Sequence, residues 1–314
     1  MYVFFAKLTD LVTKEQLFIH LVEELSSTDL FFGHSAIDAE DEAMMILMHL
    51  FNESTSEVLN SGSSDVSETI VNQAEQICYQ RISQRKPLAY IIKKAWFCGM
   101  EFKVDERALV PRSPIAELIQ NQFKPWFSKE NQSCTALDLC TGSGCIGISM
   151  SIFMENMKVD ISDISMEALQ LADENIKKYN LENQVKAIHS DLFENITGKY
   201  DLIVTNPPYV SNDEFAELPQ EYFAEPKLGL VSENSGLDIP VRILLRAADY
   251  LTEDGLLFLE VGYSDELLND TFPEIDFEWI EFLNGGEGVC VFSREKSLEY
   301  QPVFSKFIQQ QNVL

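Results

Sequence analysis

The sequence predicts an α/β fold in which a doubly wound, mainly parallel sheet ends in an antiparallel hairpin, with a small helical domain in front of it. From about Cys134 onward, short apolar runs alternate with amphipathic stretches, which is typical of a parallel sheet with covering helices. Residues 1–85 instead repeat apolar side chains every three or four positions, which indicates helices. We therefore expect a helical domain over 1–85, a hairpin linker over 86–125 and the α/β domain over 126–314.

Three amphipathic helices are expected in the N-terminal region, over residues 13–25, 39–51 and 64–83. Asp38 or Asp41 can cap the second helix, because a short acidic side chain accepts hydrogen bonds from the free N–H groups of a first turn. The acidic, serine-rich stretch 52–65 is expected to be a loop.

Two hairpins are expected further along the chain. The first joins residues 95–97 to 102–104 around Gly99, where a glycine between two extended runs favours a turn. The second joins 277–282 to 289–292 across the glycine-rich stretch 284–288 and closes the sheet.

The composition is that of a cytoplasmic globular protein. The chain has 314 residues and 46% hydrophobic content, enough for a substantial core. No apolar run approaches the roughly 18 residues of a membrane helix, and residues 1–7 lack the basic start of a signal peptide. The six cysteines show no Cys-x-x-Cys spacing, so we expect reduced, mostly buried thiols and no metal site.

The net charge of -28 narrows the range of partners. So acidic a chain is repelled by duplex phosphate, and no run of lysine or arginine offsets this. It attracts a basic protein instead, although the same charge also serves simple solubility. We therefore expect no membrane partner and no sequence-specific DNA binding.

The tetrapeptide Asn206-Pro207-Pro208-Tyr209 is the most informative motif. It follows the apolar run 200–205, and two consecutive prolines force the chain out of the sheet in a stiff, extended arm. The Asn206 side-chain oxygen and the Pro207 carbonyl are then two acceptors for the N–H groups of a planar nitrogen, on which Tyr209 can stack. The motif favours alkylation of an amide or amine nitrogen, and a rigid turn is the alternative interpretation.

A glycine-rich turn follows the expected strand 135–139. The spacing Gly142-x-Gly144-x-x-Gly147 also fits a dinucleotide fingerprint. A carboxylate from Asp138 at the mouth of this turn argues against a pyrophosphate, because like charges repel. It suits a ligand with ammonium and sulfonium charges, such as S-adenosylmethionine.

Acidic residues also follow the next two expected strands. Asp163, after the run 158–161, is placed either to accept from ribose hydroxyls or to cap a helix. Asp191 is placed to meet an adenine amino group, and Leu192 to cover the ring.

These residues together resemble the class I S-adenosylmethionine-dependent methyltransferases whose fourth strand ends in Asn-Pro-Pro-aromatic. The resemblance implies a catalytic group, a cofactor-binding group and S-adenosylmethionine as cofactor. The catalytic group is Asn206, Pro207, Pro208 and Tyr209. The cofactor group is Asp138, Cys140, Thr141, Gly142, Ser143, Gly144, Asp163, Asp191, Leu192 and Asn206.

A second stretch, residues 87–117, is similar to the N(5)-glutamine methyltransferases, in the branch that acts on large-subunit ribosomal protein three. The sister branch, which modifies peptide release factors, reads Pro-Arg-Pro-Glu-Thr-Glu where this chain reads Pro111-Arg112-Ser113-Pro114 and then Ile-Ala-Glu. The resemblance spans about residues 81–295. It implies that the helical domain recognises the substrate, a basic ribosomal protein that is free or in an early assembly particle.

Three alternatives stay open: a release-factor glutamine methyltransferase, a DNA adenine methyltransferase, which has a related motif, and a non-catalytic assembly factor. The acidic charge disfavours the DNA enzyme, and the intact glycine turn disfavours the binding factor. The long acidic segment between Tyr209 and Pro240 is expected to be a lid over the substrate. Arg112 is expected to form an ion pair or to anchor the cofactor.

Overall fold

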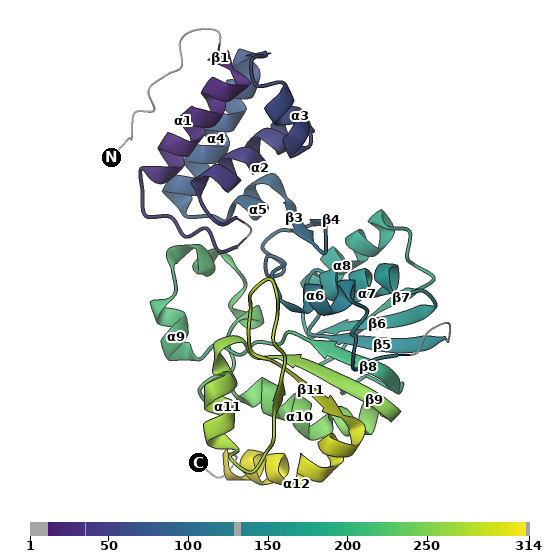
Figure 1. Cartoon of the computed structure of the whole chain (residues 1–314). Helices are drawn as coiled ribbons and strands as arrows, with labels where there is room; N and C mark the ends of the chain where they lie inside the picture. The colour runs from purple at the N-terminus through teal and green to yellow at the C-terminus, as the bar shows by residue number, and fades with distance from the viewer. Residues whose placement is uncertain (1–11, 35, 129–132, 312–314) are drawn as a thin grey trace. The chain divides into compact units, whose positions relative to one another are not determined.

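The computed structural model describes residues 12–34, 36–128 and 133–311 (Figure 1). Residues 1–7, on which the signal-peptide prediction depends, lie outside this part of the chain. The chain divides into two compact units. The first comprises Met1–Ala95 together with Pro219–Ala224, and the second comprises Trp96–Leu218 and Glu225–Leu314, each within the described residues.

The first unit is helical. Its elements are β1 (Val12–Thr13), α1 (Lys14–Ser26), α2 (Ala39–Phe51), α3 (Thr55–Asn60), β2 (Asp65–Val66), α4 (Glu68–Gln84), α5 (Leu88–Ile92) and the short 3-10 helix η1 (Gln220–Ala224). Leu17, Leu21 and Leu25 line the buried face of α1 at helical spacing and pack on α2 and α4. The Asp38 side chain caps α2 by accepting from the N–H of Asp41, so Asp38 is the cap.

Two predictions for this unit are wrong. The stretch 52–65 is not a continuous loop, because α3 forms inside it, where Ser54 and Glu57 exchange capping bonds and Val58 is buried. The third helix begins at Glu68 rather than at residue 64, because Asp65–Val66 pair with Val12–Thr13 as a short antiparallel ladder and Ser67 then caps α4.

The second unit is the α/β domain, and the chain enters it within β3 (Lys94–Phe97). Its other strands are β4 (Met100–Lys103), β5 (Cys134–Leu139), β6 (Met157–Asp163), β7 (Val185–His189), β8 (Tyr200–Thr205), β9 (Leu251–Glu260), β10 (Glu278–Trp279) and β11 (Val289–Ser293). Its helices are α6 (Ile115–Gln120), α7 (Cys145–Phe153), α8 (Met166–Lys178), α9 (Asn212–Glu217), η2 (Lys227–Gly229), α10 (Asp238–Tyr250), η3 (Gly262–Ser264), α11 (Asp265–Thr271) and α12 (Arg294–Gln311).

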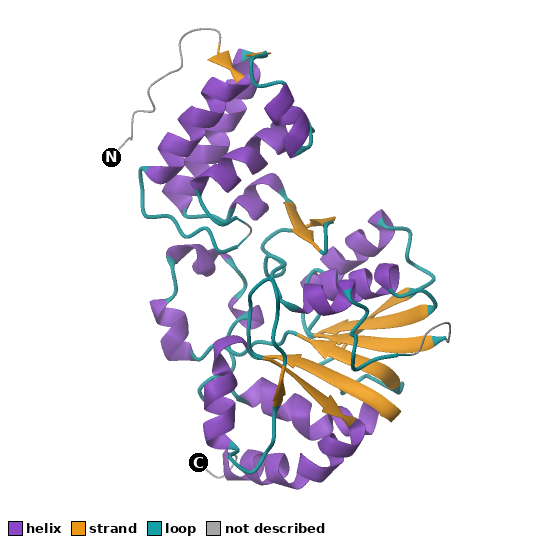
Figure 2. Cartoon of the chain, in the orientation of Figure 1, coloured by secondary structure: helices purple, strands orange, loops and turns teal. Residues whose placement is uncertain are grey.

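The main sheet has the strand order β10-β11-β9-β8-β5-β6-β7. The five strands from β9 to β7 are parallel, and β11 and β10 add antiparallel edges. Figure 2 shows α6, α7 and α8 on one face of the sheet and α10 and α12 on the other. This confirms the predicted doubly wound fold and its closing hairpin.

Element boundaries differ from the predictions in three places. The hairpin around Gly99 pairs β3 with β4, which begins at Met100 rather than at residue 102. The strand predicted over 277–282 shortens to the two residues of β10. The segment after Tyr209, expected to have little periodicity, contains α9, whose capping box joins Ser211 and Glu214.

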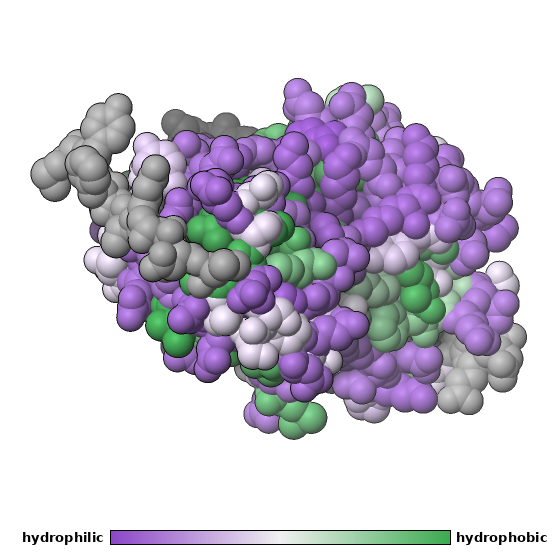
Figure 3. All heavy atoms as spheres, turned by 90° about the horizontal axis from the view of Figure 1, so that it is seen from above, coloured by the Kyte–Doolittle hydropathy of each residue, from purple (hydrophilic) through white to green (hydrophobic). Residues whose placement is uncertain are grey.

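Hydrophilic residues cover most of the face in Figure 3, and hydrophobic residues appear there as separate patches. Within the described residues no helix has the length and apolar character needed to cross a membrane. None of the six cysteines, which all lie in the described residues, belongs to a disulfide, and five are buried, which confirms the expected burial of most thiols. No group of three or more potential metal ligands gathers within the described ranges.

Candidate active site

The glycine-rich turn lies where the strand order of the sheet reverses. From the central strand β5 the chain goes to β6 on one side, and after β7 it returns to β8 on the other. Leu139, at the end of β5, pairs with Ser162 of β6 and with Thr205 of β8. Open α/β sheets bind ligands in the crevice at this point, beyond the carboxyl ends of the strands.

The turn itself is built from left-handed backbone conformations. Cys140, Gly142 and Gly144 have φ values of 61°, 57° and 83°. Gly144 is the N-terminal cap of α7, and Thr141 and Ser143 are buried within the turn. Gly147 serves close packing instead, because a Cβ there would lie 2.4 Å from Cγ2 of Ile161. The turn therefore needs glycine for its backbone conformation at Gly142 and Gly144, and for close packing at Gly147.

Asp138 lies in β5 directly before the turn, and its contact with a ligand stays a prediction. Its side chain is fully buried at the turn, where Oδ2 accepts from the Thr141 hydroxyl and, at 2.8 Å, from the N–H of Gly147. Burial raises the pKa of the Asp138 carboxyl to about 7. Oδ1 is buried with no hydrogen-bond partner in the described structure, so an acceptor is left over at the turn.

Asp163 ties the turn to the end of β6. Its Oδ2 accepts from the N–H of Gly142 at 2.9 Å, and its Oδ1 accepts from the N–H of Ser165 at 2.9 Å. Ser165 is the cap of α8, so the interpretation of Asp163 as a helix cap is wrong. Burial raises the pKa of the Asp163 carboxyl. Its contact with a ribose stays a prediction.

Asp191 and Leu192 follow β7 at the same edge of the sheet. Asp191 forms an ion pair with Arg242 of α10, with 3.1 Å between Oδ1 and Nη2. Leu192 has a φ of 44° and packs against the hydrophobic core of the α/β unit. Arg242 had no sequence signal, because the pair joins segments 51 residues apart. The adenine contacts of Asp191 and Leu192 stay predictions.

Asn206 and the two prolines leave the sheet directly after β8. Thr205, the last residue of β8, donates its hydroxyl to the Leu139 carbonyl at 2.6 Å, which joins the ends of β8 and β5. Pro207 and Pro208 are buried, whereas Asn206 and Tyr209 are half-buried. The structure thus places the tetrapeptide directly after β8, the strand that pairs with β5 at the glycine turn.

Tyr209 is held by two glycines from later loops. A Cβ on Gly262 would lie 2.7 to 2.9 Å from the Tyr209 ring, and one on Gly236 would lie 2.2 Å from the Tyr209 carbonyl oxygen. The Ser264 hydroxyl donates to the same carbonyl at 3.4 Å. Both glycines also have positive φ, so no other residue fits without displacing Tyr209.

Glu260 is a buried carboxyl beside the motif. It ends β9, and since Leu259 pairs with Thr205, Glu260 and Asn206 are the next residues on neighbouring strands. Glu260 accepts from the Ser113 hydroxyl, and burial raises the pKa of its carboxyl to about 8.

Arg112 forms an ion pair with Glu225. Its two terminal nitrogens each lie 2.6 Å from the carboxylate of Glu225, whose Oε1 also accepts from the N–H of Val110 at 3.0 Å. Of the two roles expected for Arg112, the structure shows the ion pair.

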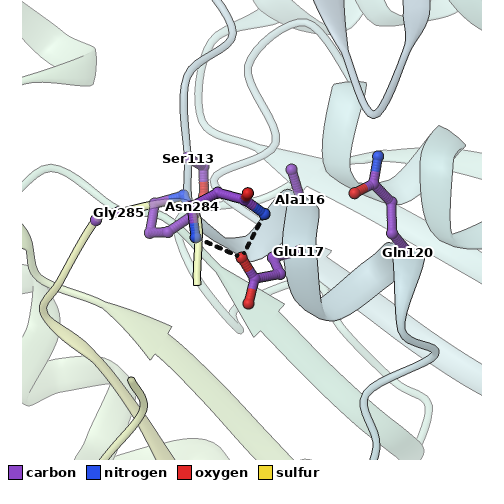
Figure 4. Close-up of a pocket in the computed structure, with 8 residues that line it drawn as sticks. Ser113, Ala116, Glu117, Gln120, Asn284 and Gly285 are labelled. Atoms are coloured by element: carbon purple, nitrogen blue, oxygen red, sulfur yellow. Dashed lines mark hydrogen bonds between the residues drawn. The ribbon is translucent and has the colours of Figure 1, made fainter. Parts of the chain in front are cut away.

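A pocket of about 350 Å³ opens next to this region (Figure 4). It is lined by Ser113, Pro114, Ala116, Glu117, Gln120, Asn284, Gly285 and Gly286. Glu117 accepts from the backbone N–H of Leu283 and from both nitrogens of Asn284, at 2.8 to 3.1 Å, and so fixes the turn between β10 and β11. None of the predicted site residues lines this pocket, which therefore differs from the predicted cofactor crevice.

Sequence reasoning also missed Asn175. This fully buried side chain of α8 donates to the Ser143 carbonyl at 2.9 Å and exchanges two bonds with the backbone of Lys103. It joins the glycine turn to β4. The nearest signal was an asparagine on the apolar face of an amphipathic helix, which is uncommon without buried partners.

The doubly wound sheet, the glycine turn at its reversal point and the Asn-Pro-Pro-Tyr segment directly after the neighbouring strand β8 define a methyltransferase of the class I fold. The methyltransferase small domain family matches residues 123–275. Three relatives carry the name ribosomal protein uL3 glutamine methyltransferase. That of Francisella tularensis is 43% identical, over 92% of each chain. That of Xanthomonas campestris is 46% identical, over 83% of this chain and 84% of the relative.

The third relative, from Neisseria gonorrhoeae, is 38% identical over 92% of this chain and 97% of its own. The chain belongs to the family of ribosomal protein uL3 glutamine methyltransferases. The resemblance drawn from residues 87–117 and from the Asn-Pro-Pro-Tyr motif is thereby confirmed.

The residues at the reversal point fit S-adenosylmethionine. The free Oδ1 acceptor of Asp138 and the partly exposed carboxylate of Asp191 suit a cationic ligand. The left-handed turn over Cys140, Gly142 and Gly144 presents backbone without bulky side chains at the two glycines. These two carboxyl groups favour a positively charged ligand over a pyrophosphate.

Proposed function

We propose that this chain methylates the side-chain amide nitrogen of a glutamine in ribosomal protein uL3, with S-adenosylmethionine as the methyl donor. The observation that carries the proposal is the rigid Asn206–Tyr209 arm, fixed by Gly236 and Gly262 next to the glycine turn. The three relatives favour uL3 over a release factor as substrate. The charge of -28 counts against duplex DNA.

The cofactor would be held at the edge formed by β5, β6 and β7. Asp138 and the turn from Cys140 to Gly144 would hold its amino-acid part, Asp163 its ribose, and Asp191 with Leu192 its adenine. When bound, S-adenosylmethionine supplies an electrophilic methyl group on a sulfonium.

Asn206 and Pro207 orient the nucleophile in the proposed mechanism. The Asn206 side-chain oxygen and the Pro207 carbonyl accept the two N–H groups of the glutamine amide, and Tyr209 packs against the amide plane. As the nitrogen forms its bond to the methyl group, its N–H groups become better donors, so both acceptors bind the transition state more tightly. The bond between the methyl carbon and the sulfonium sulfur would break as the nitrogen bonds to the methyl group, which would leave a neutral thioether, and the nitrogen would pass one N–H proton to solvent water. Orientation does most of the catalysis, since it can contribute about 7 to 11 kcal/mol.

Two further parts of the chain are assigned to binding the protein substrate. We assign recognition of the basic ribosomal protein, free or in an early assembly particle, to the helical unit, and coverage of the glutamine to the segment after Tyr209. The high negative charge supports attraction of such a protein. The cytoplasmic location stays a prediction.

Asn206 tests the proposal most directly. Asn206→Ala removes one of the two acceptors and leaves the glycine turn intact, so we expect cofactor binding to persist, reduced at most by the single contact expected of Asn206, and a methyl-transfer rate lower by about a hundredfold or more. Asn206→Asp keeps an acceptor and should retain partial activity. The measurement is transfer of labelled methyl to purified uL3 whose glutamines are replaced one at a time, with calorimetry for the cofactor.

The matched control is Asn183→Ala, an exposed asparagine in the turn after α8, which should leave both quantities unchanged. Label on adenine-containing duplex DNA, with none on uL3 glutamine, would overturn the proposal in favour of the DNA enzyme. Label on a release factor in place of uL3 would reassign the substrate.

A further inference from the structure

The segment between Val210 and Val231, here called the lid segment, has its two ends joined to each other within the α/β unit. Val210 and Val231 form an isolated parallel bridge, in which the N–H of Val210 donates to the Leu230 carbonyl and the N–H of Ser232 donates to the Val210 carbonyl, each at 2.9 Å. Val210 directly follows Tyr209. Whatever positions the lid segment therefore acts on the chain next to the catalytic motif.

Glu221, in the middle of the lid segment, belongs to the helical unit. Its side chain is fully buried. Oε1 accepts from Nη1 of Arg81 at 3.0 Å and from the N–H of Phe31 at 3.1 Å, and Oε2 accepts from Nη2 of Arg85 at 3.2 Å. Both carboxylate oxygens of Glu221 have hydrogen-bond donors, so Arg81, Arg85 and the N–H of Phe31 form a specific binding site for a carboxylate, here called the seat of Glu221.

The arginines that receive Glu221 are themselves fixed. Arg81 is buried, its Nε donates to both oxygens of Glu42 at 2.9 and 3.0 Å, and its Nη2 donates to the Phe31 carbonyl at 2.7 Å. The ring of Tyr222 lies 5.3 Å from that of Phe31 and 4.6 Å from that of His34, measured between centroids. The helical unit thus holds both a carboxylate and an aromatic ring of the lid segment.

Glu225 follows Glu221 by four residues and belongs to the α/β unit. Its buried carboxylate pairs with Arg112 at 2.6 Å and accepts from the N–H of Val110. The lid segment therefore carries two buried, arginine-paired carboxylates in succession, one in each compact unit. α9, which lies between Val210 and Glu221, has no buried residue, in contrast to the two buried carboxylates.

We propose that Arg81 and Arg85 are positioning residues for the methylation reaction, because they seat Glu221 and so hold the lid segment in place after Tyr209. This inference rests on the proposed function, in which the lid segment covers the substrate glutamine. An unpaired buried carboxylate is strongly unfavourable, so the seat is occupied only when the charge pairing is complete. Any change in the helical unit that disturbs Arg81 or Arg85 is thereby transmitted to the lid segment.

Glu221→Gln tests the inference, because it preserves shape and removes the charge. We expect faster amide hydrogen exchange over residues 211–224 and a fall of at least about tenfold in kcat/KM for uL3. Most of this fall should come from a higher KM, with a smaller change in kcat. Cofactor affinity should stay within about twofold. Glu221→Asp keeps the charge and should recover part of the loss. The matched control is Glu217→Gln, the same charge change at an exposed position of the same segment.

Arg85→Ala provides a second route if Glu221→Gln destabilises the helical unit. Arg85 is about a quarter exposed, so its removal leaves the Glu42–Arg81 pair in place, and we expect the same direction of change at smaller size. Identical exchange and kcat/KM in Glu221→Gln and Glu217→Gln would overturn the inference. So would an equal loss of cofactor affinity, since that indicates general unfolding. Absence of uL3 methylation by the wild type would instead refute the proposed function, while hydrogen exchange would still test the seat.

Discussion

Glu260 carries a buried carboxyl whose protonation is coupled to folding. Burial raises its pKa from 4.5 to about 8, against the opposing effects of the Ser113 hydroxyl and the Arg112 charge. Between these two values the folded chain keeps a proton on Glu260 that the unfolded chain has lost. The contribution of this group to stability is therefore complete below about pH 4.5 and is lost as pH rises through 8.

Glu260→Gln should remove this dependence, because glutamine mimics the protonated carboxyl at every pH. We expect the free energy of unfolding of the wild type, relative to the variant, to fall by up to about 1.4 kcal/mol per pH unit between pH 5 and 8. Urea unfolding of both proteins at several pH values measures the difference. A difference that does not change with pH would contradict the assignment.

Individual residues were predictable in position but not in environment. The order of acids and glycines along the chain placed Asp138, Asp163 and Asp191 correctly at successive strand ends, because parallel strands bring their carboxyl ends to one edge. The burial of Asp138 and the cap at Ser165 were not predictable, since both depend on how the turn folds back on its own strand.

At the scale of elements, α8 does more than cover the sheet. Asn175 projects from its buried face and satisfies backbone groups of β4 and of the glycine turn together. Three segments separated in sequence thus share one side chain. The geometry of the turn depends on a helix that contributes none of the predicted site residues.

Asn175→Ala should remove the side-chain partner of three backbone groups, the buried carbonyl of Ser143 and the partly buried N–H and carbonyl of Lys103. We expect unfolding free energy to fall by about 2 to 4 kcal/mol and cofactor affinity to fall several-fold. Urea unfolding and calorimetry provide the two measurements. Gln170→Ala, at an exposed site on the same helix, is the control and should change neither. Unaltered cofactor affinity in a destabilised Asn175→Ala protein would show that the turn holds its shape without this link.

The helices show what local pattern can and cannot predict. α2 matches its predicted range because an apolar stripe, the Asp38 cap and a left-handed Asn52 at its end all agree. α3 was missed because six residues give too short a stripe, although Ser54 and Glu57 formed a capping-box pattern inside the acidic stretch. The acidic, serine-rich composition of the stretch predicted a loop, whereas the capping box of Ser54 and Glu57 starts a helix there.

For the whole molecule, the net charge of -28 predicts a dependence on salt. Methylation of a basic protein should slow as ionic strength rises, because long-range attraction is screened within a Debye length of about 8 Å at physiological salt. Affinity for the small cofactor should change far less. Initial rates on uL3 across a salt series, with cofactor binding in the same buffers, measure both. Rates that do not respond to salt would show that charge does not steer the substrate.

The sequence did not predict that residues 219–224 return to the helical unit. Arg81 and Glu221 are 140 residues apart, and neither has a local pattern that names its partner. The fold class and the Asn-Pro-Pro-Tyr segment could be predicted, because their signals lie in residues close together in the sequence. The seat of Glu221 depends on tertiary packing of the complete helical unit.

The assignment of Pro219–Ala224 to the helical unit has a consequence for the order of events during translation. A growing chain emerges from the N-terminus, so residues 12–95 are made before β5, β8 and the catalytic motif. Until Glu221 is synthesised, Arg81 has available only one of the two carboxylates it contacts in the finished structure, that of Glu42. The N-terminal unit is therefore the first to begin folding and yet is completed only after most of the sheet has been made.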